Sequence, residues 1–252
     1  MIAVRTALAM VMLACWDAWR LLAARIDDAT TAALVLALVG VIAWRFAVSR
    51  APVPTGLIVV ALLGYALACM TGPALLQIGA AAGALVLVGF RGSGLPRLPI
   101  AGLAVLLLPV LPTLDFLLAY PLRRASAAIT VALLRMNGVE VTLNGIALEW
   151  QGQSLLFDGP CSGVRMLWAA LVLASIAALV GRHRPPAYAR TLAVATFIAV
   201  AGNALRAASL FYLENGYVDR LQGPVAHQAV GVLAFVMVAV AVLALPQVQR
   251  PA

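Results

Sequence analysis

Long apolar runs, separated by short breaks rich in arginine, proline or glycine, form the dominant pattern of this chain. A helix needs about 20 apolar residues to cross a hydrocarbon core of roughly 30 Å. By this criterion the runs predict about eight transmembrane helices, at residues 4–22, 30–48, 55–71, 73–90, 98–119, 162–180, 188–210 and 225–245. The break at Thr71-Gly72-Pro73 is so short that the third and fourth helices should form a tight hairpin. The predicted fold class is an all-α polytopic membrane protein.

Composition agrees with this pattern, since 64% of the residues are hydrophobic, 10% are charged and the mean hydropathy is +1.05. Such values lie far from those of an ordinary soluble domain. We expect a single integral membrane domain over residues 1–252, with an extracytoplasmic insert at about 120–160 and the helices of the candidate site at about 161–245. The net charge of +8 comes from arginines that flank the helices, so we expect membrane lipids and no nucleic acid as partners.

The charged residues also predict how the chain is oriented. With a cytoplasmic N-terminus, all nine acidic residues fall at or near the outer face. The same orientation puts several basic segments inside, namely those containing Arg45, Arg50, Arg91, Arg97, Arg182, Arg184, Arg190 and Arg250. The positive-inside rule counts basic residues in short loops, and by that count their excess on the inner side is modest. The inverted orientation therefore stays open. We expect an inner-membrane protein with both termini in the cytoplasm.

The interval 120–160 has no long apolar run and lies on the outer side in this orientation. Its first part, residues 121–136, spaces arginines among apolar residues as a helix lying on the membrane surface would. Its second part predicts a β-hairpin, because the segments 139–143 and 146–150 flank the turn dipeptide Asn144-Gly145. The hairpin could cover a reactive residue or hold an extended peptide by edge pairing. A structural linker is the alternative.

The most distinctive polar run enters the sixth predicted helix and reads Asp158-Gly159-Pro160-Cys161-Ser162-Gly163-Val164-Arg165. A helix N-terminus stabilises a thiolate and lowers the pKa of a cysteine placed there. Arg165 adds positive charge one turn later, although it could instead pair with Asp158. Cys161 is therefore a candidate nucleophile, with a buried and unreactive thiol as the ordinary alternative.

The other two cysteines, Cys15 and Cys69, lie inside apolar runs, where buried thiols are expected. The three cysteines are far apart in the sequence and contain no C-x-x-C pair. This spacing indicates neither a zinc site nor a paired redox motif.

Two later helix ends carry further candidates. Arg206, in the motif Asn203-Ala204-Leu205-Arg206, stands near the end of the seventh predicted helix, where a charge suggests a functional role or a side chain that snorkels to the interface. His227 lies near the start of the eighth helix and could exchange a proton near neutral pH. Because helix direction alternates, Cys161, Arg206 and His227 should share one membrane face in either orientation. These groups predict acyl transfer, with Asn203 orienting Arg206 or closing a helix contact.

Three motifs in order carry a family resemblance: Cys161-Ser162-Gly163-Val164-Arg165, Asn203-Ala204-Leu205-Arg206, and His227 with Gly231 and Phe235. The chain resembles the exosortase/archaeosortase family of multispanning membrane cysteine transpeptidases. The resemblance implies that Cys161 is the nucleophile, Arg206 binds the substrate or the oxyanion, and His227 is the general acid/base. Supporting or substrate-binding roles are expected for Arg165, Asn203, Ser162, Gly163 and Asp158.

The resemblance also implies the partners. The substrates would be secreted proteins that end in a Pro-containing motif, a transmembrane helix and a basic tail. The new C-terminus would pass to an acceptor that the sequence does not identify. No cofactor and no metal are expected.

Two other classes of function stay open from the residues alone. A membrane scaffold or small transporter would place its polar residues along a continuous path through the membrane. A transferase acting on a lipid-linked acyl or glycosyl group could use the basic residues and would need no thiol. Sensitivity to a thiol reagent distinguishes this transferase from a cysteine enzyme.

Overall fold

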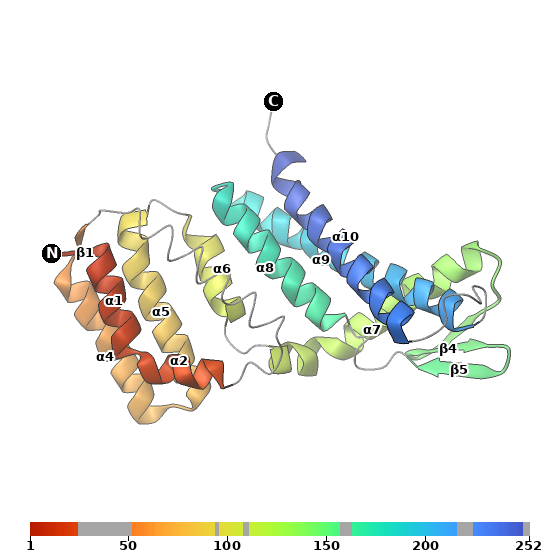
Figure 1. The fold of residues 1–252 in the computed structure, drawn as a ribbon, viewed down its shortest axis with the longest axis horizontal. Coiled ribbons are helices and arrows are strands. Elements are labelled where there is room, and N and C mark those ends of the chain that lie inside the picture. The colour runs from red at the N-terminus through yellow and green to blue at the C-terminus, as the bar shows by residue number, and fades with distance from the viewer. Residues whose placement is uncertain (25–51, 94–95, 108–110, 157–162, 216–223, 249–252) are drawn as a thin grey trace. The chain divides into compact units, whose positions relative to one another are not determined.

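The computed structural model describes residues 1–24, 52–93, 96–107, 111–156, 163–215 and 224–248 (Figure 1). Its contacts group into two compact units. The first unit is Met1–Val110 with Ala178–Tyr188, and the second is Leu111–Ala177 with Ala189–Ala252. Helices make up most of the described part of each unit, in agreement with a mostly helical membrane protein. The single integral domain over 1–252 stays a prediction.

The described part of the first unit consists of helices and two short strands. Its described elements are β1 (Ile2–Ala3), α1 (Val4–Ala14), α2 (Trp16–Ala23), β2 (Pro52–Val53), α4 (Thr55–Thr71), α5 (Ala74–Ser93) and α6 (Arg97–Leu107). The two short strands pair antiparallel. Helices α1 and α2 are bent by 64° relative to each other at Cys15, so the run predicted at 4–22 is not one straight helix. The run predicted at 30–48 lies outside the described residues.

The core of the first unit forms because buried side chains recur at helical spacing. On α4, the buried positions are three or four residues apart, at Ile58, Ala61, Tyr65 and Ala68. Ile58, Ala61 and Tyr65 pack with Val4, Ala7 and Val11 of α1 and with Ala81, Ala84 and Val88 of α5. Cys15 is buried as expected, whereas Cys69 is exposed, because it lies on the outward face of α4.

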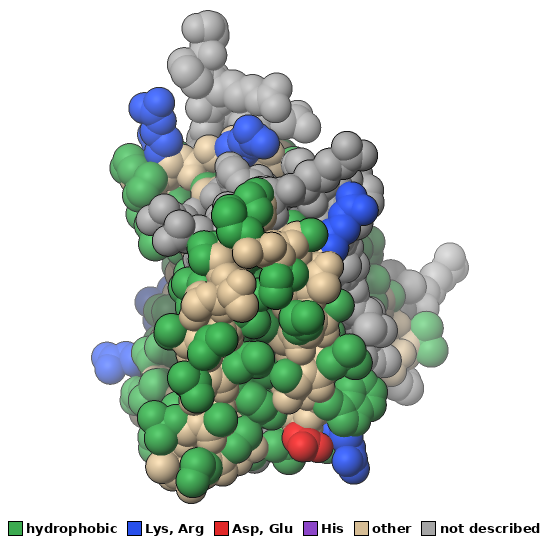
Figure 2. Space-filling view, turned by 90° about the vertical axis from the view of Figure 1, so that its left-hand side faces the viewer, with side chains coloured by type: hydrophobic (Ala, Val, Ile, Leu, Met, Phe, Trp, Pro, Cys, Tyr) green, Lys and Arg blue, Asp and Glu red, His purple; other side chains and the backbone are tan. Residues whose placement is uncertain are grey.

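The outward face of these helices is also apolar. On α4 the exposed residues include Val59, Val60, Leu63 and Leu67. Figure 2, which looks toward α1 and α4, shows hydrophobic side chains over most of this face, with charged side chains mainly toward its margins. A helix that is hydrophobic all round is typical of a membrane span. The first unit therefore has the surface expected of a protein that contacts lipid.

Three helices in the described part are long and apolar enough to cross a membrane, at Leu111–Met136, Pro185–Leu213 and Val225–Leu245. The bent pair α1 and α2 passes the same test if it is taken as one broken span. Shorter apolar helices occupy Thr55–Thr71, Ala74–Gly89 and Val164–Val180. The structure therefore supports an integral membrane protein, while the predicted number of eight spans is not confirmed.

The second unit contains four long helices and a small sheet in its described part. The helices are α7 (Leu111–Met136), α8 (Val164–Val180), α9 (Pro185–Glu214) and α10 (Pro224–Val248). The last residues of α8 and the first residues of α9 belong to the first unit. Helix α7 corrects two predictions, since it begins inside the run predicted at 98–119 and continues as one helix to residue 136. The separate surface helix predicted after Pro121 is wrong. Pro121 lies inside α7, as membrane helices tolerate when neighbouring groups satisfy the freed backbone.

A three-stranded antiparallel sheet occupies the interval in which the sequence predicts a hairpin. Its strands, in spatial order, are β3 (Thr142–Asn144), β4 (Ala147–Trp150) and β5 (Gln153–Leu156). The first turn is shifted by one residue from the prediction, because Asn144 pairs with Ala147 and leaves Gly145 and Ile146 as the loop. Of these two, only Gly145 has a positive φ, which is the pattern of a type II′ turn. Strand β5 was not predicted.

The turn between β4 and β5 is a second two-residue loop. It consists of Gln151 and Gly152, because Trp150 pairs with Gln153. Both loop residues have positive φ, 49° and 78°, as a type I′ turn requires. A positive φ is uncommon for a residue other than glycine, so Gln151 carried no recognisable turn signal in the sequence.

The sheet is anchored on α7 and α9 through a shared hydrophobic cluster. Val139, Val141 and Leu148 supply its sheet side, with Ala127, Val131 and Leu134 from α7 and Ala208 and Phe211 from α9. The ring of Trp150 meets Phe211 edge-on, with centroids 5.3 Å apart and planes at 77°. This arrangement is a favourable aromatic geometry. The sheet is therefore fixed to the C-terminal half of α9, which also carries Asn203 and Arg206.

Helices α8, α9 and α10 pack through small residues. Their buried cluster contains Met166, Leu167, Ala170 and Ala174 from α8, Ala195 and Ala199 from α9, and Ala234, Val238 and Val242 from α10. Gly202 of α9 lies so close to Val238 that a Cβ atom there would overlap the valine side chain. Small residues let helix backbones approach closely where the surrounding solvent is lipid. The close packing fixes α9 against α10 near the candidate site residues.

Candidate functional site

Gly163 is the residue immediately before helix α8. It precedes Val164, the first residue of the helix, and its carbonyl oxygen accepts a hydrogen bond of 2.9 Å from the amide of Leu167. Its φ of +76° lies in the left-handed region, which glycine adopts without steric cost. The predicted site residues Asp158, Cys161 and Ser162, which come just before it, lie outside the described residues.

Asn203 of α9 packs directly against Gly163. A Cβ atom built on Gly163 would lie 2.9 Å from both Cγ and Nδ2 of Asn203. Asn203 is only 2% exposed, and its Nδ2 donates a hydrogen bond of 3.0 Å to Oγ of Ser126. This amide cannot rotate away without losing that bond, so the close approach of α8 and α9 depends on a glycine at position 163.

Ser126 and Thr130 of α7 complete a buried polar cluster that sequence analysis missed. Each is only 1% exposed. Oγ1 of Thr130 lies 2.8 Å from the carbonyl oxygen of Ser126 and 3.2 Å from that of Ala204, so its hydroxyl proton is shared between α7 and α9. The available signal was a serine and a threonine four residues apart in an apolar helix, which places both on one face. The cluster sets the register of α7 against α9 at Asn203.

Arg206 follows Asn203 by three residues and so lies about one turn further along α9. Its side chain is half-buried, and its Nε is buried. A Cβ atom on Gly231 of α10 would lie 3.6 Å from Nε and 3.8 Å from Nη2 of Arg206. The guanidinium therefore lies against α10 at the position where that helix has no side chain. A charged group held in an apolar helix bundle is a candidate functional group.

His227 lies on the same face of α10 as Gly231. It is half-buried in the first turn of a helix that begins at Pro224. Its position is four residues before Gly231, about 6 Å along the helix axis, and Ala234 and Val238 continue the stripe into the buried core. The face that carries His227 is therefore the face that contacts Arg206.

The structure thus brings most of the described candidates to one end of the bundle. Gly163, Asn203, Arg206 and the His227 face of α10 belong to the same unit and are connected by the contacts through Asn203 and Gly231. Figure 1 shows the first turns of α8 and α10 near each other, on the side where the sheet lies. Arg165 differs from the others, because its side chain is exposed on the first turn of α8. Within the described ranges, no three histidine, cysteine or acidic side chains are grouped as metal ligands.

Replacing Gly163 with alanine should destabilise the protein more than the same change at Gly152. The two glycines have almost the same φ, +76° and +78°, so both variants bear a similar backbone cost, about 1–2 kcal/mol. Only at position 163 does the new methyl group meet Asn203, because Gly152 has no neighbouring heavy atom within 4 Å. Overpacking of this kind costs a further 1–3 kcal/mol or so. Thermal unfolding in detergent measures the difference.

The contact itself is tested by adding Asn203→Ala to Gly163→Ala. The double variant should recover part of the loss caused by Gly163→Ala, because truncation of Asn203 removes the atoms that the methyl group meets. Strictly additive losses, or equal unfolding midpoints for Gly163→Ala and Gly152→Ala, would contradict the close packing.

Comparison with known families identifies the chain. The family model described as transmembrane exosortase (Exosortase_EpsH) matches residues 4–244. No curated protein and no solved structure matches the chain significantly. The family match spans both compact units and includes Cys161, Arg206 and His227. The chain therefore belongs to the transmembrane exosortase family.

Proposed function

We propose that this protein is a membrane cysteine transpeptidase that cleaves the C-terminal sorting signal of secreted proteins. The observation that carries the proposal is the grouping of Gly163, Asn203, Arg206 and the His227 face of α10 at one end of the bundle. Family membership supports the same reading. In it, Cys161 is the nucleophile, Arg206 holds the developing negative charge and His227 transfers protons.

The position of Cys161 in the chain supports its role. It precedes Gly163 by two residues, so covalent geometry keeps its Cα within about 7 Å of the glycine that packs on Asn203. The amides at the start of α8 provide a positive helix end that stabilises a thiolate. The reactive sulfur would therefore belong to the same end of the bundle as Arg206.

The proposed reaction begins with attack of the Cys161 thiolate on a peptide carbonyl carbon. The tetrahedral oxyanion is stabilised by the guanidinium of Arg206, with the amides of Ser162 and Gly163 as further donors. The C–N bond then breaks, His227 gives a proton to the leaving amine, and a thioester remains on Cys161. An acceptor amine that attacks this thioester gives transpeptidation, and water gives hydrolysis. Arg165 and Asp158 would support the site through substrate contacts or a mutual ion pair.

The substrate and the side of the membrane are part of the proposal. The substrates would be secreted proteins whose C-terminus carries a Pro-containing motif, a transmembrane helix and a basic tail. The site would face the extracytoplasmic side of the inner membrane, with both chain termini in the cytoplasm. Glu140, just before the sheet, and Glu149 of β4 would then lie outside, as the sequence predicts for all nine acidic residues.

Replacing Cys161 with alanine should abolish processing, whereas Cys69→Ala should leave it unchanged. Cys69 is a matched control because its thiol is exposed on α4, in the unit that does not contain the candidate site. The measurement follows a secreted reporter with a Pro-containing motif, an apolar span and an arginine-rich tail, by loss of its C-terminal tag in cells that express equal amounts of each inserted variant. An active Cys161→Ala variant would overturn the proposed nucleophile.

His227→Gln should slow processing by about 10²–10⁴-fold, the range of general acid–base catalysis, because glutamine cannot transfer the proton. The matched control is His183→Gln. His183 lies in the turn between α8 and α9, at the opposite end of both helices from Gly163 and Arg206. Initial rates of reporter processing in isolated membranes give the comparison. Equal rates for the two variants would remove His227 from the mechanism.

Single cysteines should report the orientation of the chain. In a chain whose native cysteines are replaced by alanine, Gln151→Cys at the sheet turn should react with a membrane-impermeant maleimide in intact spheroplasts. Arg184→Cys, in the turn between α8 and α9, should react only after lysis. Both positions are exposed, so accessibility to water differs only through the membrane. The reversed labelling pattern would establish the inverted orientation.

A further inference from the structure

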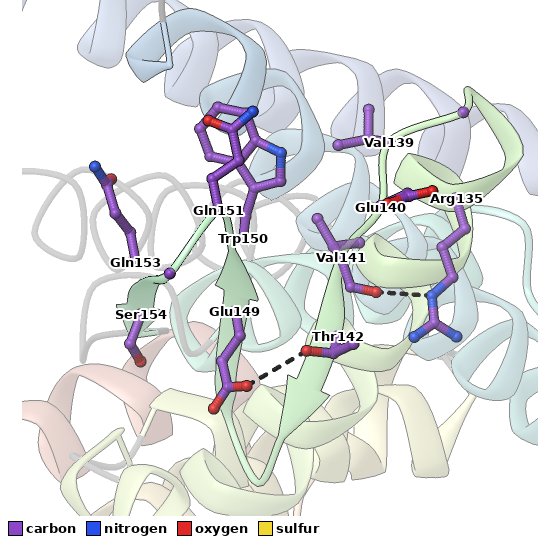
Figure 3. Close-up of a pocket in the computed structure, with 12 residues that line it drawn as sticks. Arg135, Val139, Glu140, Val141, Thr142, Glu149, Trp150, Gln151, Gln153 and Ser154 are labelled. Atoms are coloured by element: carbon purple, nitrogen blue, oxygen red, sulfur yellow. Dashed lines mark hydrogen bonds between the residues drawn. The ribbon is translucent and has the colours of Figure 1, made fainter.

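An open groove lies at the end of the sheet where β4 turns into β5 (Figure 3). It has a volume of about 820 Å³, within the range of roughly 300–1,000 Å³ found for ligand sites. Its walls come from the end of α7, the segment 138–141, the end of β4 and the turn into β5. All of these belong to the second unit. None of these residues takes part in the mechanism proposed above.

The groove exists because two segments are held apart. On one side, the amide of Val139 donates to the carbonyl of Leu134, at 3.0 Å, and Nε of Arg135 donates to the carbonyl of Val141, at 2.9 Å. These bonds hold the segment against α7. The β3–β4 ladder therefore begins only at Thr142 and Glu149, and the two chains separate beyond that pair. On the other side, the tight turn at Gln151 and Gly152 fixes β5 beside β4.

The lining mixes apolar and polar side chains and carries both signs of charge. Figure 3 shows Glu149, Gln151 and Gln153 along one side and Glu140 and Arg135 along the other. Glu149 is held in place, because it accepts hydrogen bonds from Nδ2 of Asn144 at 3.0 Å and Oγ1 of Thr142 at 3.4 Å. Within the described residues, Glu140 and Arg135 form no ion pair. The groove therefore offers side-chain amides, a fixed carboxylate and a guanidinium to a ligand.

This chemistry narrows the class of ligand. Two carboxylates disfavour a polyanion such as a nucleic acid. A polypeptide in extended form presents both hydrogen-bond donors and acceptors along its backbone and can carry a charged side chain of either sign. It is the ligand whose groups match amides, carboxylates and a guanidinium in one groove.

A contact on α9 connects the wall of the groove to the helix that carries Arg206. Trp150, in that wall, packs on Phe211 of α9 with ring centroids 5.3 Å apart. Phe211 follows Arg206 by five residues, which is about 7.5 Å along the helix axis. An extended chain advances about 3.3 Å per residue, so a few residues cover that axial distance.

We propose that this groove binds the extended segment of the substrate polypeptide next to the bond that is cut. The inference rests on the proposed function, since it assigns the polypeptide to the same reaction. The groove contributes affinity and register through Gln153, Glu149 and Arg135. The chemical step remains at the bundle end that carries Arg206 and His227.

Photocrosslinking tests the occupant directly. A photoreactive phenylalanine analogue replaces Gln153 in the groove or, as the matched control, Ile146 in the turn at the other end of the sheet. Each is placed in the full chain with Cys161→Ala and expressed with the tailed reporter described above. Position 153 should crosslink to the reporter, and position 146 should not. Absence of a reporter crosslink at 153, equal crosslinking at both positions, or a crosslink only to a saccharide would overturn the proposal.

A blocking substitution gives an independent readout. Ser154→Trp fills the groove and should lower the initial rate at least tenfold at low reporter level, with recovery at high level, because binding rather than chemistry is impaired. Ile146→Trp should process the reporter at the wild-type rate. If wild type cuts the reporter but Ser154→Trp is as fast, the groove proposal fails while the proposed function stands. If wild type cuts nothing, the proposed function fails, and the crosslink at 153 still decides whether a polypeptide occupies the groove.

Discussion

The contact between Gly163 and Asn203 is the constraint on which the arrangement of the candidate site depends. It sets the distance between the start of α8 and the middle of α9 at a value that allows no side chain at position 163. The positive φ of Gly163 turns the chain into α8 at the same point. One glycine therefore satisfies both a backbone requirement and a packing requirement.

The polar groups around this contact explain why it holds a single register. A hydrogen-bonding group buried among apolar helices is costly unless it has a partner. Asn203 meets this demand through Ser126, and Thr130 bridges the backbones of α7 and α9. Sliding α7 by one residue would separate these partners, whereas a purely apolar interface would tolerate such a shift at lower cost. The buried hydroxyls and amide thus specify position as well as contributing stability.

The sequence predicted features that depend on local pattern and missed those that depend on tertiary partners. The run at 55–71 is α4 as predicted, because hydropathy and the proline and glycine at its ends mark it locally. The bend at Cys15 and the continuation of α7 through Pro121 were missed, because no glycine or proline marks the bend and a proline ordinarily ends a helix. At the site, Asn203 and Arg206 stood out as polar groups in apolar helices. Ser126 did not, because a serine in such a helix most often bonds to its own backbone.

Helix α9 connects these observations, because one rigid element carries the whole sequence of contacts. Asn203 packs on Gly163 at the start of α8, and Arg206 lies against α10 at Gly231. Phe211 contacts the sheet through the ring of Trp150. Eight residues separate the first of these from the last, which is about 12 Å along the axis. A displacement of α9 along its axis would therefore move the guanidinium and the sheet groove together relative to α8. The wall of the groove and the guanidinium of Arg206 are thus positioned by the same helix.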